Sequence, residues 1–142
     1  MPLLAAVLAV LGARRLLLIV TVEGTSMAPT YAPGRRLLVL RTPLARILVR
    51  PGAVVVFRLP RTDPDGPEPP LLVKRVAARA GDPIPPEVRP PLPASPTRVP
   101  RGHLILLGDN PSTSTDSRTW GYVSSSTLTA VLLTPLPPAP AR

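Results

Sequence analysis

Short apolar and β-branched runs recur along the chain beyond residue 15, and turn residues such as Pro33-Gly34 and Pro51-Gly52 separate them. Runs of this length and composition, bounded by Gly and Pro, are typical of strands. None keeps a 3.6-residue period for long enough to predict a helix. The predicted strands are 16–22, 36–40, 53–59, 71–78, 103–107 and 128–133. The pattern therefore predicts an all-β, compact domain over residues 16–133.

The N-terminal segment has a different pattern, because residues 3–13 are wholly apolar and Arg14 and Arg15 follow them. An apolar run of that length spans only about half of a bilayer core. A span over 3–22 would place both arginines in mid-bilayer, at about 2.5–3.5 kcal/mol each. A cleaved signal peptide is the alternative, but no basic residue precedes the apolar run. We predict a short retained membrane anchor over residues 1–15.

Three segments rich in proline interrupt or follow the strands. Residues 60–70 are expected to form an exposed loop. Residues 83–100 lack the backbone donors of a central strand and are expected to form an extended polyproline excursion over the surface. Residues 134–142 are expected to be a disordered tail.

Composition narrows the possible chemistry of this chain of 142 residues, which is long enough for one domain. Cysteine is absent, so disulfides, thiolate metal sites and cysteine nucleophiles are excluded. His103 is the only histidine, which excludes a site with several histidine ligands. We therefore predict neither a metal nor a cofactor.

The net charge of +9 comes almost entirely from arginine, because Lys74 is the only lysine. Seven arginines and no acidic residue lie between Glu23 and Asp63. Such a stretch suits an anionic surface, either phospholipid or nucleic acid, or is simply a solvated basic face. Few aromatic residues are available to stack on bases, which argues against nucleic acid as a partner.

Candidate chemistry begins with Ser26, in the segment 23–30 that directly follows the first predicted strand. Gly24 permits a tight turn before it and Pro29 stiffens the chain after it, so the hydroxyl could be held at an accessible strand end. An ordinary serine-containing turn is the alternative.

Lys74 lies within an apolar strand, where alternation places Leu72 and Val76 on its own face. Burial there would disfavour the ammonium form and lower the pKa of the lysine. A neutral lysine amine is a competent general base, whereas arginine stays protonated.

A third segment, residues 108–121, is dense in short polar side chains and ends on an Asp116–x–Arg118 pair that could form an ion pair. It could also be a polar surface loop or a cation-binding loop. With Ser26 and Lys74 it would supply a nucleophile, a base and a network to orient them. A Ser26–His103–Asp triad is the competing arrangement.

At these residues the sequence resembles the type I signal peptidases, membrane-bound serine endopeptidases with a Ser–Lys dyad. Their Ser-Met-x-Pro-Thr motif matches residues 26–30, and their Lys-Arg-Val motif matches 74–76, followed by Gly-Asp at 81–82. Their third motif matches Gly-Asp-Asn at 108–110 and Ser-x-Asp-Ser-Arg at 114–118. Only 25 residues separate Asp82 from Gly108, so the chain resembles the compact members, including mitochondrial inner-membrane forms.

The resemblance implies a role for each matching side chain. Ser26 would be the nucleophile and Lys74 the general base. Ser114 would orient the Lys74 amine, Asp116 and Arg118 would pair to brace the loop, and Asp109 would support the site. The oxyanion would be held by the Ser26 N–H and a second donor, which cannot be a side-chain hydroxyl at position 24 because Gly24 stands there.

The resemblance also implies the setting: a membrane enzyme whose β-rich catalytic domain lies on the extracytoplasmic side and removes signal peptides from exported preproteins after small residues. Arg14 and Arg15 conflict with this orientation, since the positive-inside rule places them in the cytosol. Three alternatives are open: a maturation peptidase dedicated to one partner such as a metalloenzyme precursor, a self-cleaving repressor, and a non-enzymatic basic β-domain that docks on membranes. No DNA-binding domain precedes Ser26, which disfavours the repressor.

Overall fold

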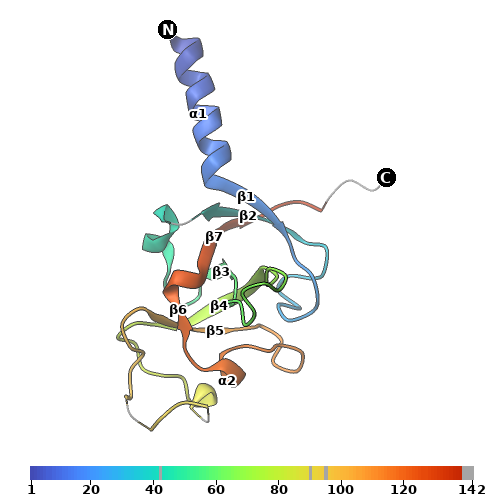
Figure 1. The fold of residues 1–142 in the computed structure, drawn as a ribbon. Coiled ribbons are helices and arrows are strands. Elements are labelled where there is room, and N and C mark those ends of the chain that lie inside the picture. The colour runs from blue at the N-terminus through green and yellow to red at the C-terminus, as the bar shows by residue number, and fades with distance from the viewer. Residues whose placement is uncertain (42, 90, 95, 139–142) are drawn as a thin grey trace.

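The computed structural model describes residues 1–41, 43–89, 91–94 and 96–138, and its core is one antiparallel sheet (Figure 1). The strand order is β1-β2-β7-β3-β4-β5-β6. The strands are β1 (Leu17–Thr21), β2 (Arg36–Arg41), β3 (Val54–Phe57), β4 (Leu72–Arg79), β5 (His103–Leu107), β6 (Val123–Ser124) and β7 (Leu128–Pro135). The helices are α1 (Pro2–Leu16), α2 (Ser117–Trp120) and the 3-10 turns η1 (Leu44–Leu48), η2 (Pro86–Val88) and η3 (Ser125–Thr127).

The six predicted strands all occur, with ends that move by at most two residues. The β-rich prediction is therefore confirmed, but the all-β prediction is incomplete because α1 and α2 are helical. Sequence reasoning missed β6, whose two residues pair with the start of β5 at His103 and Leu104. A strand of two residues shows no alternation and so leaves no pattern to detect.

The centre of the sheet is buried on both faces. All four residues of β3 are buried: Val55 and Phe57 belong to one apolar cluster, and Val56 belongs to another with Leu37 and Val39 of β2. This explains why β3 reads as a continuous apolar run rather than an alternating one. The ring of Trp120 packs edge-on against Phe57, with 6.2 Å between the ring centroids, and so fixes α2 to this core.

Residues 83–100 do not form the extended polyproline excursion that we predicted. Pro83 and Arg98 form an antiparallel bridge, and η2 lies between them. Ile84, Val88 and Val99 are buried in a third apolar cluster with Ala78 and Ile105 of the sheet. The prolines exclude a central strand, but the apolar residues between them still fold the segment onto the sheet. Pro90 and Ser95 lie outside the described residues.

The predicted anchor forms a helix at one end of the chain, and the other end departs from the sequence prediction. The predicted anchor is helical, and α1 stands away from the sheet with none of its fifteen described residues buried (Figure 1). Within the described chain, no helix combines the length and apolarity needed to cross a bilayer. At the other end, Thr134 and Pro135 pair with β2, so the predicted disordered tail begins as strand. Residues 139–142 lie outside the described residues.

Candidate active site

The turn that carries Ser26 is tied to the sheet on one side and to the 108–113 segment on the other. Val22, just after β1, is buried, and its N–H donates to the Arg35 carbonyl at 2.8 Å. Met27 is fully buried and anchors the turn beneath Ser26. The backbone N–H of Asn110 donates to the Ser26 carbonyl at 2.9 Å. The backbone around Ser26 is therefore fixed by the sheet and by the 108–113 segment, while the Ser26 side chain is only half-buried.

Lys74 is the third residue of β4, on the face of the strand that points inward, and is only 4% exposed. Its Nζ donates a hydrogen bond to Ser114 Oγ at 3.0 Å. Burial lowers the pKa of Lys74, and the nearby Arg118 charge lowers it further, whereas the charge of Asp116 acts in the opposite direction. The net effect is a pKa below the ordinary value of 10.5, as the sequence reasoning expected.

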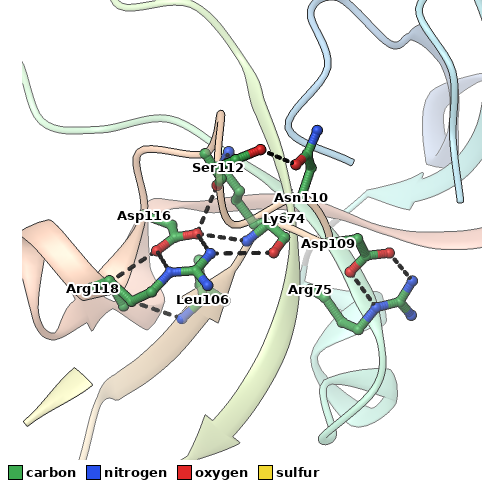
Figure 2. Close-up of polar contacts among 11 residues, drawn as sticks. Lys74, Arg75, Leu106, Asp109, Asn110, Ser112, Asp116 and Arg118 are labelled. Carbon is green, nitrogen blue, oxygen red and sulfur yellow. Dashed lines mark hydrogen bonds and ion pairs between the residues drawn. The ribbon is translucent and has the colours of Figure 1, made fainter. Parts of the chain in front are cut away.

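Asp116 organises the polar side chains around Lys74 and is fully buried. Its Oδ2 accepts from Ser114 Oγ at 2.6 Å and from the Gly108 N–H at 2.8 Å. Arg118 binds the same carboxylate through both oxygens, at 3.0 and 2.5 Å (Figure 2). Burial alone would raise the pKa of Asp116, but these hydrogen bonds outweigh it and hold the pKa below 3.8. The carboxylate therefore stays charged and fixed.

Gly108, the residue after β5, lets the Ser26 turn and the Ser114 loop approach each other, because no residue with a side chain would fit there. A Cβ there would lie 2.1 Å from Ser114 Oγ and 2.7 Å from the Ser26 carbonyl oxygen. Gly108 thus brings the Ser26 turn and the Ser114 loop into contact. Its place in a motif was visible in the sequence, but this steric role was not.

Asp109, the next residue, is bound to a different partner. Arg75 on the opposite face of β4 donates to both carboxylate oxygens, at 2.9 and 2.6 Å (Figure 2). Arg75 also donates to the Gly52 carbonyl at 2.8 Å. The hydrogen bond from Arg75 holds the pKa of Asp109 below its ordinary value. Asp109 therefore ties the loop to β4 from outside the Lys74 network, and sequence reasoning did not identify Arg75 as its partner.

A cleft of about 480 Å³ contains both Ser26 and Lys74. One wall is formed by residues 18–23, from β1, and the other by residues 70–74, at the start of β4. Most of its lining is aliphatic, and Glu23 and Arg58 are the charged residues besides Lys74.

The competing Ser26–His103–Asp triad is not assembled in this structure. His103 lines a separate hollow at the start of β5. Its Nδ1 is bonded to the Arg101 carbonyl at 2.9 Å, and its ring lies against Tyr122. In the part of the chain that the structure describes, no three His, Asp or Glu side chains cluster where they could hold a metal ion.

Comparison with known proteins gives two matches. A family model described as signal peptidase, peptidase S26, matches residues 1–89 and 86–136. Mitochondrial inner membrane protease subunit 2 from Schizosaccharomyces pombe is 35% identical over 120 residues, which cover 80% of this chain. The same alignment covers 61% of that relative, so this chain spans about three-fifths of its length.

Proposed function

Because the chain belongs to the peptidase S26 family of signal peptidases, we propose that it is a serine endopeptidase with Ser26 as nucleophile and Lys74 as general base. The neutral Lys74 amine takes the proton of the Ser26 hydroxyl as Oγ attacks the scissile carbonyl. The resulting ammonium then gives that proton to the leaving amine as the peptide bond breaks. Water hydrolyses the acyl-enzyme in a second round of the same proton transfers.

The observation that carries this proposal is the orientation of Lys74 within the cleft that it shares with Ser26. The Ser114 hydroxyl donates its one proton to Asp116, so it can only accept from Lys74. A Lys74 N–H therefore points at Ser114, and the lone pair of the neutral amine is left for another partner. Burial favours that neutral form, because the ammonium loses solvation.

The remaining residues act through this pair. Ser114 is a positioning residue for the amine, and Asp116 fixes the direction of the Ser114 hydroxyl. Arg118 balances the charge of Asp116, which would otherwise hold the proton on Lys74. Asp109 supports the site by fastening the loop to β4 through Arg75. The Ser26 N–H is proposed as one oxyanion donor.

The walls of the cleft suit a substrate in extended conformation. β5 pairs with β4 only from Arg75 onward, so the edge of residues 72–74 that faces away from β3 is open in the described chain. On the other wall, β1 is the edge strand of the sheet. An extended peptide could pair with such edges and bring its scissile bond to Ser26.

Family membership supports preproteins with small residues before the cleavage site as substrates, and it supports action at a membrane, with the catalytic domain on the extracytoplasmic side. Similarity to a mitochondrial inner membrane protease subunit extends the proposed substrates to mitochondrial preproteins. We propose that α1 associates with the bilayer through its exposed apolar side chains. Residues 17–21 then separate the membrane from the Ser26 turn by roughly 17 Å of strand.

Cleavage of a preprotein with an Ala-x-Ala site in detergent tests the function. The wild type should release the mature protein, and Ser26→Ala and Lys74→Met, both of nearly conserved size, should not. Cleavage by wild type and by Lys74→Met at equal rates would remove Lys74 from the mechanism. If only mitochondrial inner-membrane preproteins are cleaved, the enzyme is dedicated rather than general.

A further inference from the structure

A second hollow, of about 280 Å³, lies away from the catalytic cleft between η1, the end of β4 and the start of β5. Arg46 and Arg79 line it, together with His103 and Ser125, over an apolar floor that includes Leu104 and Leu128. No Asp or Glu among the described residues lines it. The catalytic mechanism uses none of these side chains.

The two arginines are free to bind an anion. Both are exposed, and Arg79 uses one N–H for the Val49 carbonyl, at 3.3 Å, which leaves most of its guanidinium donors. Asp82 accepts from the backbone N–H of Arg79, but its side chain is not part of the hollow. The Nδ1–H of His103 donates to the Arg101 carbonyl, so the ring borders the hollow without supplying a donor of its own to an anion. Guanidinium and hydroxyl groups on one concave surface are suited to a phosphate group.

Directly beside this hollow, Ile47 is 89% exposed. It occupies η1 next to Arg46, and Arg41 and Arg50 flank the same turn. An isolated exposed isoleucine is unremarkable in itself. Here it stands among exposed arginines, as expected of a segment that dips into the interface of an anionic membrane.

The position of η1 in the fold agrees with that setting. Leu40, near the end of β2, pairs with Leu17, the first residue after α1. η1 begins four residues after Leu40 and therefore lies at the end of the sheet from which α1 projects (Figure 1). A hollow beside Arg14 and Arg41 marks the same junction. If α1 associates with a bilayer, η1 approaches the headgroups.

We infer that the hollow between Arg46 and Arg79 binds the phosphate of an anionic phospholipid while Ile47 inserts among the acyl chains. The occupant is a lipid rather than a free phosphate, because η1, which carries the exposed Ile47, lies at the same end of the sheet as the end of α1. This site is separate from Ser26 and Lys74. It gives the domain a second point of attachment, which limits its rotation about α1.

The absence of cysteine makes a direct test possible. Ile47→Cys in the full chain, labelled with an environment-sensitive fluorophore, is mixed with vesicles of phosphatidylcholine containing about a third phosphatidylglycerol. Emission should rise and shift to the blue on binding. The same label at the exposed position Thr115, as Thr115→Cys, should not respond. Cosedimentation shows that the protein is bound in each case, so an unchanged signal at position 47 in bound protein would overturn the inference.

The charge of the hollow is tested with the double variant Arg46→Gln/Arg79→Gln. Each arginine near an anionic surface contributes about fivefold in partitioning, so the double variant should lower affinity for the anionic vesicles about 25-fold and abolish the signal at position 47. Arg61→Gln/Arg89→Gln loses the same charge elsewhere and should bind nearly as the wild type does. If both double variants lost the same affinity for the vesicles, net charge alone would explain the effect, and the proposed lipid site would be wrong.

Inorganic phosphate separates the two sources of the ligand. Millimolar phosphate at constant ionic strength should leave vesicle binding nearly unchanged, because phosphate does not replace the contacts of Ile47 and α1 with the bilayer. Complete release of the position 47 signal by phosphate would show a phosphate site rather than a lipid site. All of these readouts are independent of proteolysis, so failure here and failure of the proposed enzyme activity are distinguishable.

Discussion

Lys74 and Arg75 are adjacent in β4 and lie on opposite faces of the strand. The two side chains differ in how they contact a nearby carboxylate. Lys74 is buried and reaches the Asp116 carboxylate only through the Ser114 hydroxyl. Arg75 binds Asp109 directly through two hydrogen bonds and keeps a third of its side chain exposed. Both acids belong to the loop that follows β5.

The difference lies in what each arrangement does to the proton. A hydroxyl between Lys74 and Asp116 weakens the attraction that would keep the amine charged, and burial then lowers the lysine pKa. Direct contact with Asp109 raises the pKa of Arg75, so its charge is permanent. One face of the strand therefore holds a group able to exchange a proton, and the other holds a structural ion pair.

Exchanging the two side chains tests this contrast most severely. Lys74→Arg should lower kcat at least about 1,000-fold, because a guanidinium cannot act as a base. Arg75→Lys should keep kcat within about tenfold, since it loses only the bidentate geometry. Cleavage rates of one preprotein, with circular dichroism to confirm folding, measure both. Comparable rates in the two variants would mean that the faces are not distinct.

Gly108 precedes Asp109 and donates its N–H to Asp116, and it has no room for a side chain. Gly108→Ala should destabilise the fold by about 3 kcal/mol, because the new methyl group overlaps Ser114 and the Ser26 carbonyl. Gly24→Ala is the matched control: its φ of +70° imposes strain, but nothing lies within 4 Å. It should cost about 1–2 kcal/mol. Urea unfolding measures both, and equal costs would contradict the packing at Gly108.

Replacing each acid by asparagine measures how much its hydrogen-bond network contributes to the free energy of unfolding. Asp116→Asn should cost about 3 kcal/mol, since it breaks the ion pair of a fully buried carboxylate with Arg118. Asp109→Asn should cost about 1 kcal/mol, because its pair with Arg75 is partly solvated. Chemical unfolding near neutral pH gives these values. A larger cost at Asp109 would reverse the assignment of the buried network.

The pH dependence of cleavage gives the smallest but most specific difference. The rate should rise with pH as Lys74 deprotonates, with a midpoint below 10.5. The negative charge of Asp116 raises the pKa of Lys74, so Asp116→Asn should move the midpoint to lower pH. Asp109→Asn should leave it in place. Profiles of kcat/KM against pH, recorded on folded protein, provide the measurement. If Asp116→Asn left the midpoint unchanged, the charge of Asp116 would not influence the pKa of Lys74.

The local sequence pattern was sufficient to predict the strands, the faces of β4 and one ion pair. Alternation placed Lys74 and Arg75 on opposite faces of a strand, because side chains alternate with period two whatever the fold. Turn residues and apolar runs located six strands. The short spacing of Asp116 and Arg118 predicted their ion pair, which forms across one turn of chain.

Tertiary structure decided the rest, because it depends on contacts between residues far apart in the chain. Ser114 meets Lys74 across 40 positions, and Asp109 meets Arg75 across 34. Neither local pattern nor composition distinguishes Asp109 from Asp116 as the partner of Lys74. The burial of Val88 and Val99, within the proline-rich segment 83–100, follows from the sheet face they cover. The lowering of the Lys74 pKa likewise arises only when folding removes the water around its amine.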